Sequence, residues 1–116
     1  DGTPVAWRFE HDVIGRETRA VTSYGWSYGS EFGAQIEERY DGTVAVSTDD
    51  PAAAWAHGEA VYRIEWPEAT VHTEARLDVR SDATAYHVVV EILAEEINGQ
   101  VRHERRYERT IPRQLQ

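Results

Sequence analysis

The segment with the clearest chemical potential is Gly25-Trp26-Ser27-Tyr28-Gly29 (GWSYG), inside the stretch TSYGWSYGSEFG. It matches the G-x-S-x-G pattern of a nucleophile elbow, where a strained strand-to-helix turn exposes a serine hydroxyl for acyl transfer. An elbow requires a central parallel strand before the serine and a helix after it. The flanking sequence favours a hairpin strand and a glycine-rich loop instead, so we interpret Ser27 as non-catalytic.

Histidine residues could act as a general base for such a serine or as metal ligands. His72, His87 and His103 fall within alternating strand patterns, where cross-strand contacts at a solvent-facing surface explain them more simply. His72 and Glu74 share one face of a strand, but zinc requires a convergent set of ligands. We therefore expect no catalytic residue, no cofactor-binding residue and no metal site in this chain.

The composition restricts the class of protein. The 116 residues suffice for one domain with a modest core, and 41% hydrophobic with 28% charged residues is typical of globular chains. The net charge of -9 argues against a nucleic-acid partner, because phosphate binding requires clustered positive charge. No apolar run approaches the ~20 residues that span a bilayer, so we expect no membrane partner and a cytoplasmic location. The chain contains no cysteine, which excludes disulfides and thiolate ligands.

The dominant pattern is an alternation of apolar and polar residues with a period of two, which predicts half-buried β-strands. In the second half of the chain it covers residues 59–66, 69–80, 86–92 and 100–109. Turn residues separate these segments at Pro67-Glu68, at Ser81-Asp82-Ala83 and at Asn98-Gly99. Four long antiparallel strands are therefore expected to follow one another through short turns.

The first half of the chain is less regular but still indicates strands, over residues 4–10, 17–24, 34–40 and 43–48. Asp41-Gly42 is the expected turn between the last two. The one helix candidate runs from Pro51 to Ala56, with Asp49 or Asp50 as its N-cap. This capping explains the acidic pair more simply than a calcium site does. We expect an all-β, antiparallel sandwich or flattened barrel of about eight strands, with one short helical turn near Pro51.

Several short motifs occur in an order that resembles a segment of known hydrolases. Trp7, Asp12 and Gly15 come first, and a DDP motif follows at residues 49–51. A strand ending in Trp66-Pro67 and the stretch VRSDATAYHVVVEI lead to the close ERRYERTIPR, which contains Arg105, Arg106, Tyr107, Glu108, Ile111, Pro112 and Arg113. Over nearly its whole length the chain resembles the C-terminal segment of the cocaine-esterase-like and X-prolyl dipeptidyl-peptidase-like hydrolases.

This resemblance implies a non-catalytic β domain that follows an α/β-hydrolase body. The Ser-Asp-His triad of the family lies in that body, so the resemblance transfers no catalytic residue to this chain. The chain begins at Asp1 without an initiating methionine. Processing or tag removal would explain this start, and so would excision from a longer protein. We expect residues 1–116 to be a single β domain, the C-terminal portion of a longer hydrolase. Its partner would be the catalytic body, in the same chain or as a neighbour.

Aromatic residues supply the candidate interaction surface. Tyr24, Trp26, Tyr28 and Phe32 gather with glycines in what we expect to be one loop, and large rings at a docking surface provide rigid apolar anchors. We expect this loop to dock the domain on the hydrolase body and to frame its substrate entrance. Two alternatives stay open: a stand-alone small β-barrel that binds or transforms an apolar molecule, and a carbohydrate-binding module with exposed, coplanar rings.

Overall fold

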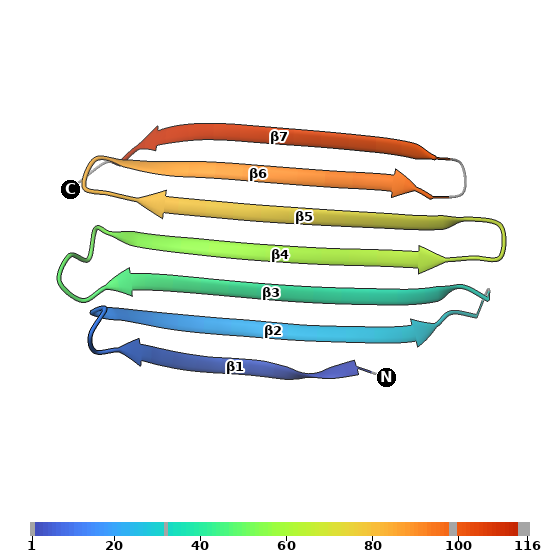
Figure 1. Cartoon of the computed structure of the whole chain (residues 1–116), viewed down its shortest axis with the longest axis horizontal. Helices are drawn as coiled ribbons and strands as arrows, with labels where there is room; N and C mark the ends of the chain where they lie inside the picture. The colour runs from blue at the N-terminus through green and yellow to red at the C-terminus, as the bar shows by residue number, and fades with distance from the viewer. Residues whose placement is uncertain (1, 32, 98–99, 114–116) are drawn as a thin grey trace.

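The computed structural model describes residues 2–31, 33–97 and 100–113. Within these ranges the chain forms seven antiparallel strands that pair in sequence order in one sheet (Figure 1). The strands are β1 Gly2–Asp12, β2 Glu17–Gly29, β3 Gln35–Ser47, β4 Ala54–Glu65, β5 Thr70–Ser81, β6 Ala85–Glu96 and β7 Val101–Pro112. The all-β, antiparallel class predicted from the alternating pattern is confirmed.

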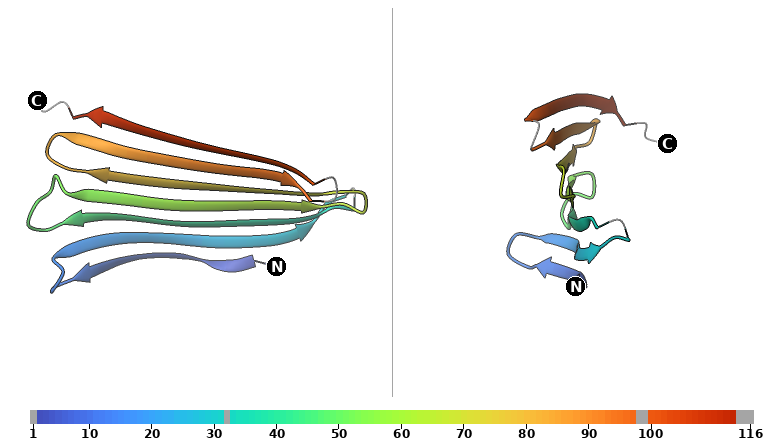
Figure 2. Two further views of the ribbon diagram at one scale, coloured as in Figure 1. Left: turned by 45° about the horizontal axis from the view of Figure 1, so that its top comes forward. Right: turned by 90° about the vertical axis from the view of Figure 1, so that its right-hand side faces the viewer.

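The sheet is a single open layer. Figure 2 shows the strands following one another with no second sheet and no helix over either face of the described chain. Strands β1 and β7 form opposite edges, and each strand contacts only its neighbours in sequence order. The described residues therefore enclose no barrel interior, and the two faces of the sheet have to be considered separately.

The register assigns each strand side chain to one face, because paired residues share a face and successive residues alternate. One row of the sheet runs through Thr43, His57 and Asp78, and we call its side the polar face. The opposite side, the apolar face, carries most of the large rings. These are Trp7, Phe9, Tyr24, Trp26, Tyr28, Tyr40, Tyr62, Tyr86 and Tyr107.

Two of the predicted strands are one strand, which accounts for seven strands instead of about eight. Residues 34–40 and 43–48 were expected to flank a turn at Asp41-Gly42, but β3 continues through both residues and pairs there with β2 and β4. A Cβ atom at Gly42 would lie 2.6 Å from the Tyr40 hydroxyl oxygen. Gly42 thus leaves space for the Tyr40 ring on the apolar face and makes no turn.

The segment around Pro51 forms a β-turn, so the helical turn predicted there was wrong. The amide of Ala53 donates to the Asp50 carbonyl at 2.9 Å, which places Pro51 at the second position of the turn, where its fixed φ fits well. The Asp50 carboxylate accepts from the Ala52 amide at 3.1 Å, as a capping residue would. Strand β4 begins at Ala54, because Ala54 pairs with Val46 of β3 and with Ser81 of β5.

The described residues form almost no core. The buried hydrophobic side chains among them are alanines, at positions 34, 45 and 85. Trp7 and Phe9 are each 74% exposed. Domains are normally built from at least two packed layers, and the apolar face lacks the layer that would cover it.

Candidate functional site

The GWSYG segment lies inside strand β2, not in a turn. Ser27 is paired with Glu37 of β3, and its Oγ accepts a hydrogen bond from the Gln35 side-chain amide at 2.8 Å. Its side chain points to the polar face of β2, which lies between β1 and β3 in an antiparallel sheet. The strained strand-to-helix turn that defines a nucleophile elbow does not occur at Ser27.

The aromatic residues expected in one loop instead occupy alternate positions of β2. Tyr24, Trp26 and Tyr28 point to the apolar face, because β2 stays paired with β3 as far as Gly29. Trp26 is 49% exposed and Tyr28 42%. The predicted loop position of these three was wrong, although the exposure of Trp26 and Tyr28 fits a contact surface. Phe32, the fourth, lies outside the described residues.

The rings on the first four strands form a continuous surface that we call the aromatic region; it consists of Trp7, Phe9, Tyr24, Trp26, Tyr28, Tyr40 and Tyr62. Tyr24 and Tyr40 stack across the β2–β3 pair, with ring centroids 5.8 Å apart. The Tyr28 hydroxyl donates to the Glu38 carboxylate at 2.8 Å. This hydrogen bond raises the pKa of Tyr28 to about 12. The Glu38 carboxylate, which lies beside these rings on the apolar face, is thus already hydrogen-bonded.

The far end of the apolar face has a different composition. Strand β6 places aliphatic side chains there, and β7 places two arginines around a tyrosine. We call this the aliphatic strip; it consists of Val88, Val90, Ile92, Arg105, Tyr107, Arg109 and Ile111. A shallow groove of about 440 Å³ runs along most of it. Arg105 and Arg109 make no ion pair or side-chain hydrogen bond within the described part of the chain.

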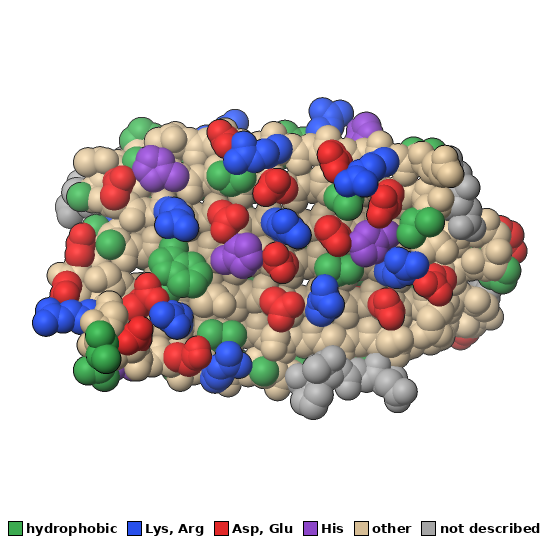
Figure 3. Space-filling model, in the orientation of Figure 1, with side chains coloured by type: hydrophobic (Ala, Val, Ile, Leu, Met, Phe, Trp, Pro, Cys, Tyr) green, Lys and Arg blue, Asp and Glu red, His purple; other side chains and the backbone are tan. Residues whose placement is uncertain are grey.

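The polar face consists mainly of charged side chains that pair with one another. Figure 3 shows arginine, acidic and histidine side chains alternating over it. Arg102 lies 2.5 Å from the Glu104 carboxylate, and Arg106 pairs with Glu108 in the same way. Exposed pairs of this kind contribute less than ~1 kcal/mol each. A hollow of about 560 Å³ on β5–β7 is lined by the Arg102–Glu104 pair and by other charged side chains, among them Glu91 and Arg105.

The Trp55 side chain covers Ala45 on the polar face. The Trp55 indole donates to the Glu17 carboxylate at 2.9 Å, reaching across β3, and Arg19 donates to the same carboxylate at 2.6 Å. The hydrogen bond from Arg19, then that from Trp55, lowers the pKa of Glu17. Ala45, which pairs with both Arg19 and Trp55, is 1% exposed as a result.

The sequence reasoning missed a histidine–carboxylate pair at the centre of the polar face. His57 Nδ1 lies 2.7 Å from Asp78 Oδ1, and its Nε2 lies 3.5 Å from Glu59. The hydrogen bond to Asp78 raises the pKa of His57. Thr43 stands beside His57 in the same row, but no hydrogen bond joins them in the described chain. A catalytic triad requires that bond between nucleophile and base, and the described residues do not form it.

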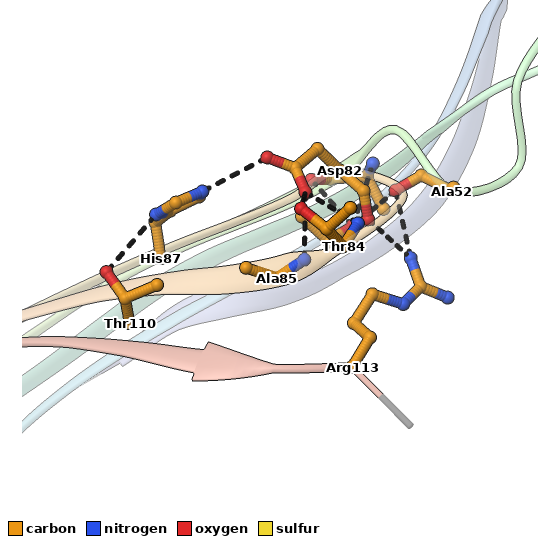
Figure 4. A network of polar contacts seen from close by, with 9 residues as sticks. Ala52, Asp82, Thr84, Ala85, His87, Thr110 and Arg113 are labelled. Atoms are coloured by element: carbon orange, nitrogen blue, oxygen red, sulfur yellow. Dashed lines mark hydrogen bonds and ion pairs between the residues drawn. The ribbon is translucent and has the colours of Figure 1, made fainter. Parts of the chain in front are cut away.

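Two of the motifs that carry the hydrolase resemblance, DDP and IPR, come together at one end of the sheet, where Arg113 contacts Ala52 (Figure 4). The Arg113 guanidinium donates to the carbonyls of Ala52 at 3.2 Å and Asp82 at 3.0 Å. It also lies over the Tyr86 ring, 5.2 Å from the centroid. The IPR motif therefore contacts the turn that contains Asp50 and Pro51 of the DDP motif, so both motifs contribute to the structure at this end of the sheet.

The carboxylate of Asp82 organises the β5–β6 turn beside this arginine. It accepts hydrogen bonds from the amides of Thr84 and Ala85, both at 2.8 Å, and lies 3.1 Å from His87 Nε2. The backbone bond from Thr84, then the contact with His87, holds the pKa of Asp82 well below its usual range. The turn predicted at Ser81-Asp82-Ala83 is thus confirmed.

No metal centre is formed by the residues that the structure describes. They include no group of three or more histidine, aspartate or glutamate side chains that could hold an ion. Asp49, considered above as a calcium ligand, pairs with Arg16 at 3.1 Å. Among the described residues, no helix is long and apolar enough to cross a membrane.

Comparisons of the chain with protein-family models, with curated proteins and with solved structures found no match. The hydrolase resemblance therefore stays a prediction from short motifs. The geometry shows a sheet with one face rich in ion pairs and one face that the described residues leave uncovered.

Proposed function

We propose that the chain is a non-catalytic accessory module of an α/β-hydrolase. Its aromatic region docks on the catalytic body and its β6–β7 end frames the substrate entrance, so that the sheet supplies one layer of a β-sandwich. The observation that carries the proposal is the exposure of the apolar face, where Trp7 and Phe9 are mostly in contact with solvent. The DDP and IPR motifs support the choice of a hydrolase as partner.

The size of the apolar face supports a protein partner. The sheet measures 53 by 31 Å in its two longer dimensions, which gives a face on the order of 1,600 Å². The aromatic region covers four of the seven strands, so it offers about 900 Å², slightly more than the ~800 Å² that one partner buries in a standard interface. Monomeric proteins rarely expose apolar patches of more than a few hundred Å².

The edges of the sheet favour contact through the face and not through strand addition. Strand β1 has an irregularity between Thr3 and Ala6, and bulges of this kind prevent edge pairing. Strand β7 carries charged side chains on both faces, for example Arg102 and Arg105, which is a second protective device. Both edges are therefore poor templates for another strand.

The test is co-expression of the chain with the α/β-hydrolase body encoded in the same or an adjacent reading frame. We expect a one-to-one complex by size-exclusion chromatography with light scattering. Trp7→Ser/Trp26→Ser should weaken its Kd at least about 30-fold, because buried tryptophans dominate interface energies. Arg63→Ser/Arg102→Ser, on the polar face, should leave the complex intact.

A missing complex, or equal losses in the two double variants, would contradict docking through the aromatic region. The chain alone should turn over p-nitrophenyl acetate no faster than Ser27→Ala does. An activity that is lost in Ser27→Ala would overturn the non-catalytic assignment.

A further inference from the structure

We propose that the aliphatic strip binds an amphiphilic carboxylate, a molecule with an extended apolar body and an anionic head. The binding depends on the side chains of the strip alone. Its biological role, selection of an acyl-type substrate at the entrance, rests on the proposed function.

The strip has the shape that an extended apolar chain requires. Val88, Val90 and Ile92 occupy alternate positions of β6, so they form a straight row about 13 Å long. The β7 residues paired with them are Arg109, Tyr107 and Arg105 respectively. A groove of about 440 Å³ covers the Val88 and Val90 end of this row, where Arg109 of the strip and the paired Arg106 and Glu108 also line it. Its volume falls within the range of ~300–1,000 Å³ found for small-molecule sites.

The charge of the strip selects the head group. Arg105 and Arg109 have no carboxylate partner in the described chain, although the protein contains 21 acidic and 12 basic residues. Arg102 and Arg106, on the same strand but on the polar face, both pair with glutamates. The planar guanidinium binds a carboxylate through two parallel hydrogen bonds. A carboxylate is therefore the group that satisfies this site.

A second copy of the chain is a poorer occupant. Glu38, an acidic group on the apolar face that a second copy would bring, is already bonded to Tyr28. In a face-to-face dimer, Arg105 and Arg109 would therefore lie against an apolar surface, and Glu38 would not be free to pair with them. A cationic amphiphile would meet the same two arginines and be repelled.

Binding of three twelve-carbon probes to the chain, each below its micellar concentration, tests the proposal by calorimetry. The probes are dodecanoate, dodecyl maltoside and dodecyltrimethylammonium, which share a tail and differ in head charge. The net charge of -9 favours the cation at long range, so preference for the anion requires local recognition. We expect dodecanoate to bind about tenfold more tightly than the maltoside, as two charge-assisted contacts would give.

Arg105→Gln/Arg109→Gln should reduce dodecanoate binding to the level of the maltoside, without changing maltoside binding. The matched control is Arg76→Gln/Arg80→Gln, which removes the same charge from the polar face and should keep the preference. Equal affinities for the two probes in the wild type would overturn the proposal. So would equal losses in both double variants, or a loss that follows Trp7→Ser/Trp26→Ser instead.

The two proposals fail separately. A complex with the hydrolase body that persists while the wild-type chain shows no anion preference overturns the carboxylate site alone. An anion preference that persists when no complex forms supports the site and overturns the accessory role.

Discussion

The polar and apolar faces are built by the same seven strands, yet they are completed in different ways. On β7, the arginines that point to the polar face have glutamate partners two residues away, at positions 104 and 108. The arginines that point to the apolar face, Arg105 and Arg109, have none in the described chain. Most arginines of the polar face thus have partners within the sheet, whereas the apolar face leaves large apolar side chains and these two arginines exposed to solvent.

This difference changes the expected response to substitution. A side chain on the polar face contacts neighbours within the sheet, so its replacement should change the free energy of unfolding of the isolated chain. A side chain on the apolar face contacts the sheet but is otherwise exposed to solvent. Its replacement should therefore change mainly the affinity for a partner. The following comparisons test this contrast.

The largest effect is expected where the polar face is covered. Ala45→Leu should lower the free energy of unfolding by about 2 kcal/mol, because the added atoms displace the Trp55 indole and break its bond to Glu17. Ala60→Leu, an equal enlargement on the exposed apolar face of β4, should change it by less than about 0.5 kcal/mol. Urea unfolding of both variants measures the difference, and equal costs would remove the distinction between the faces.

A smaller effect is expected from the paired and unpaired arginines near the end of the chain. Arg113→Ala removes two hydrogen bonds to carbonyls and the contact with Tyr86, which should lower the unfolding free energy by about 1–2 kcal/mol. Arg109→Ala should cost less than about 0.5 kcal/mol, since it loses no partner in the described chain. Thermal unfolding would contradict this interpretation if the two variants melted together.

Much of the strand pattern could be predicted from local sequence. The turn at Pro67-Glu68 was predicted, and it also fixes the β4–β5 register, since Trp66 bonds to Ala69 across it. Counting outward from that turn places His57 opposite Asp78. This contact was therefore predictable from the sequence, but the strand predicted over residues 59–66 began two residues after His57.

Other features depend on context that local patterns do not contain. Asp41-Gly42 has the composition of a turn, but pairing on both sides keeps it extended. Gly25 and Gly29 suggested a loop, yet they lie in β2 on the opposite face from the rings. Alternation predicts two faces for each strand, and it does not say whether the chain itself provides a layer to cover the apolar one.

The smallest effect concerns the pH dependence of the polar face. The contact with Asp78 raises the pKa of His57 above its usual value of 6.5, so the folded state binds the proton more tightly than the unfolded state. The stabilisation is therefore fully present below about pH 6.5 and is lost as the pH rises through the folded-state pKa. Because the His57 side chain is 40% exposed, the contribution should stay below about 1 kcal/mol.

The measurement is the difference in unfolding free energy between about pH 5.5 and about pH 8, on either side of the ordinary histidine range. His57→Gln should reduce the part of this difference that favours the lower pH, because it removes the group that binds the proton. His103→Gln is the control, since His103 lies on the apolar face and makes no ion pair in the described chain. If both variants changed the pH dependence equally, the stabilisation would not come from the His57–Asp78 pair. A loss confined to His57→Gln would show that a charge on the polar face acts through its neighbours within the sheet.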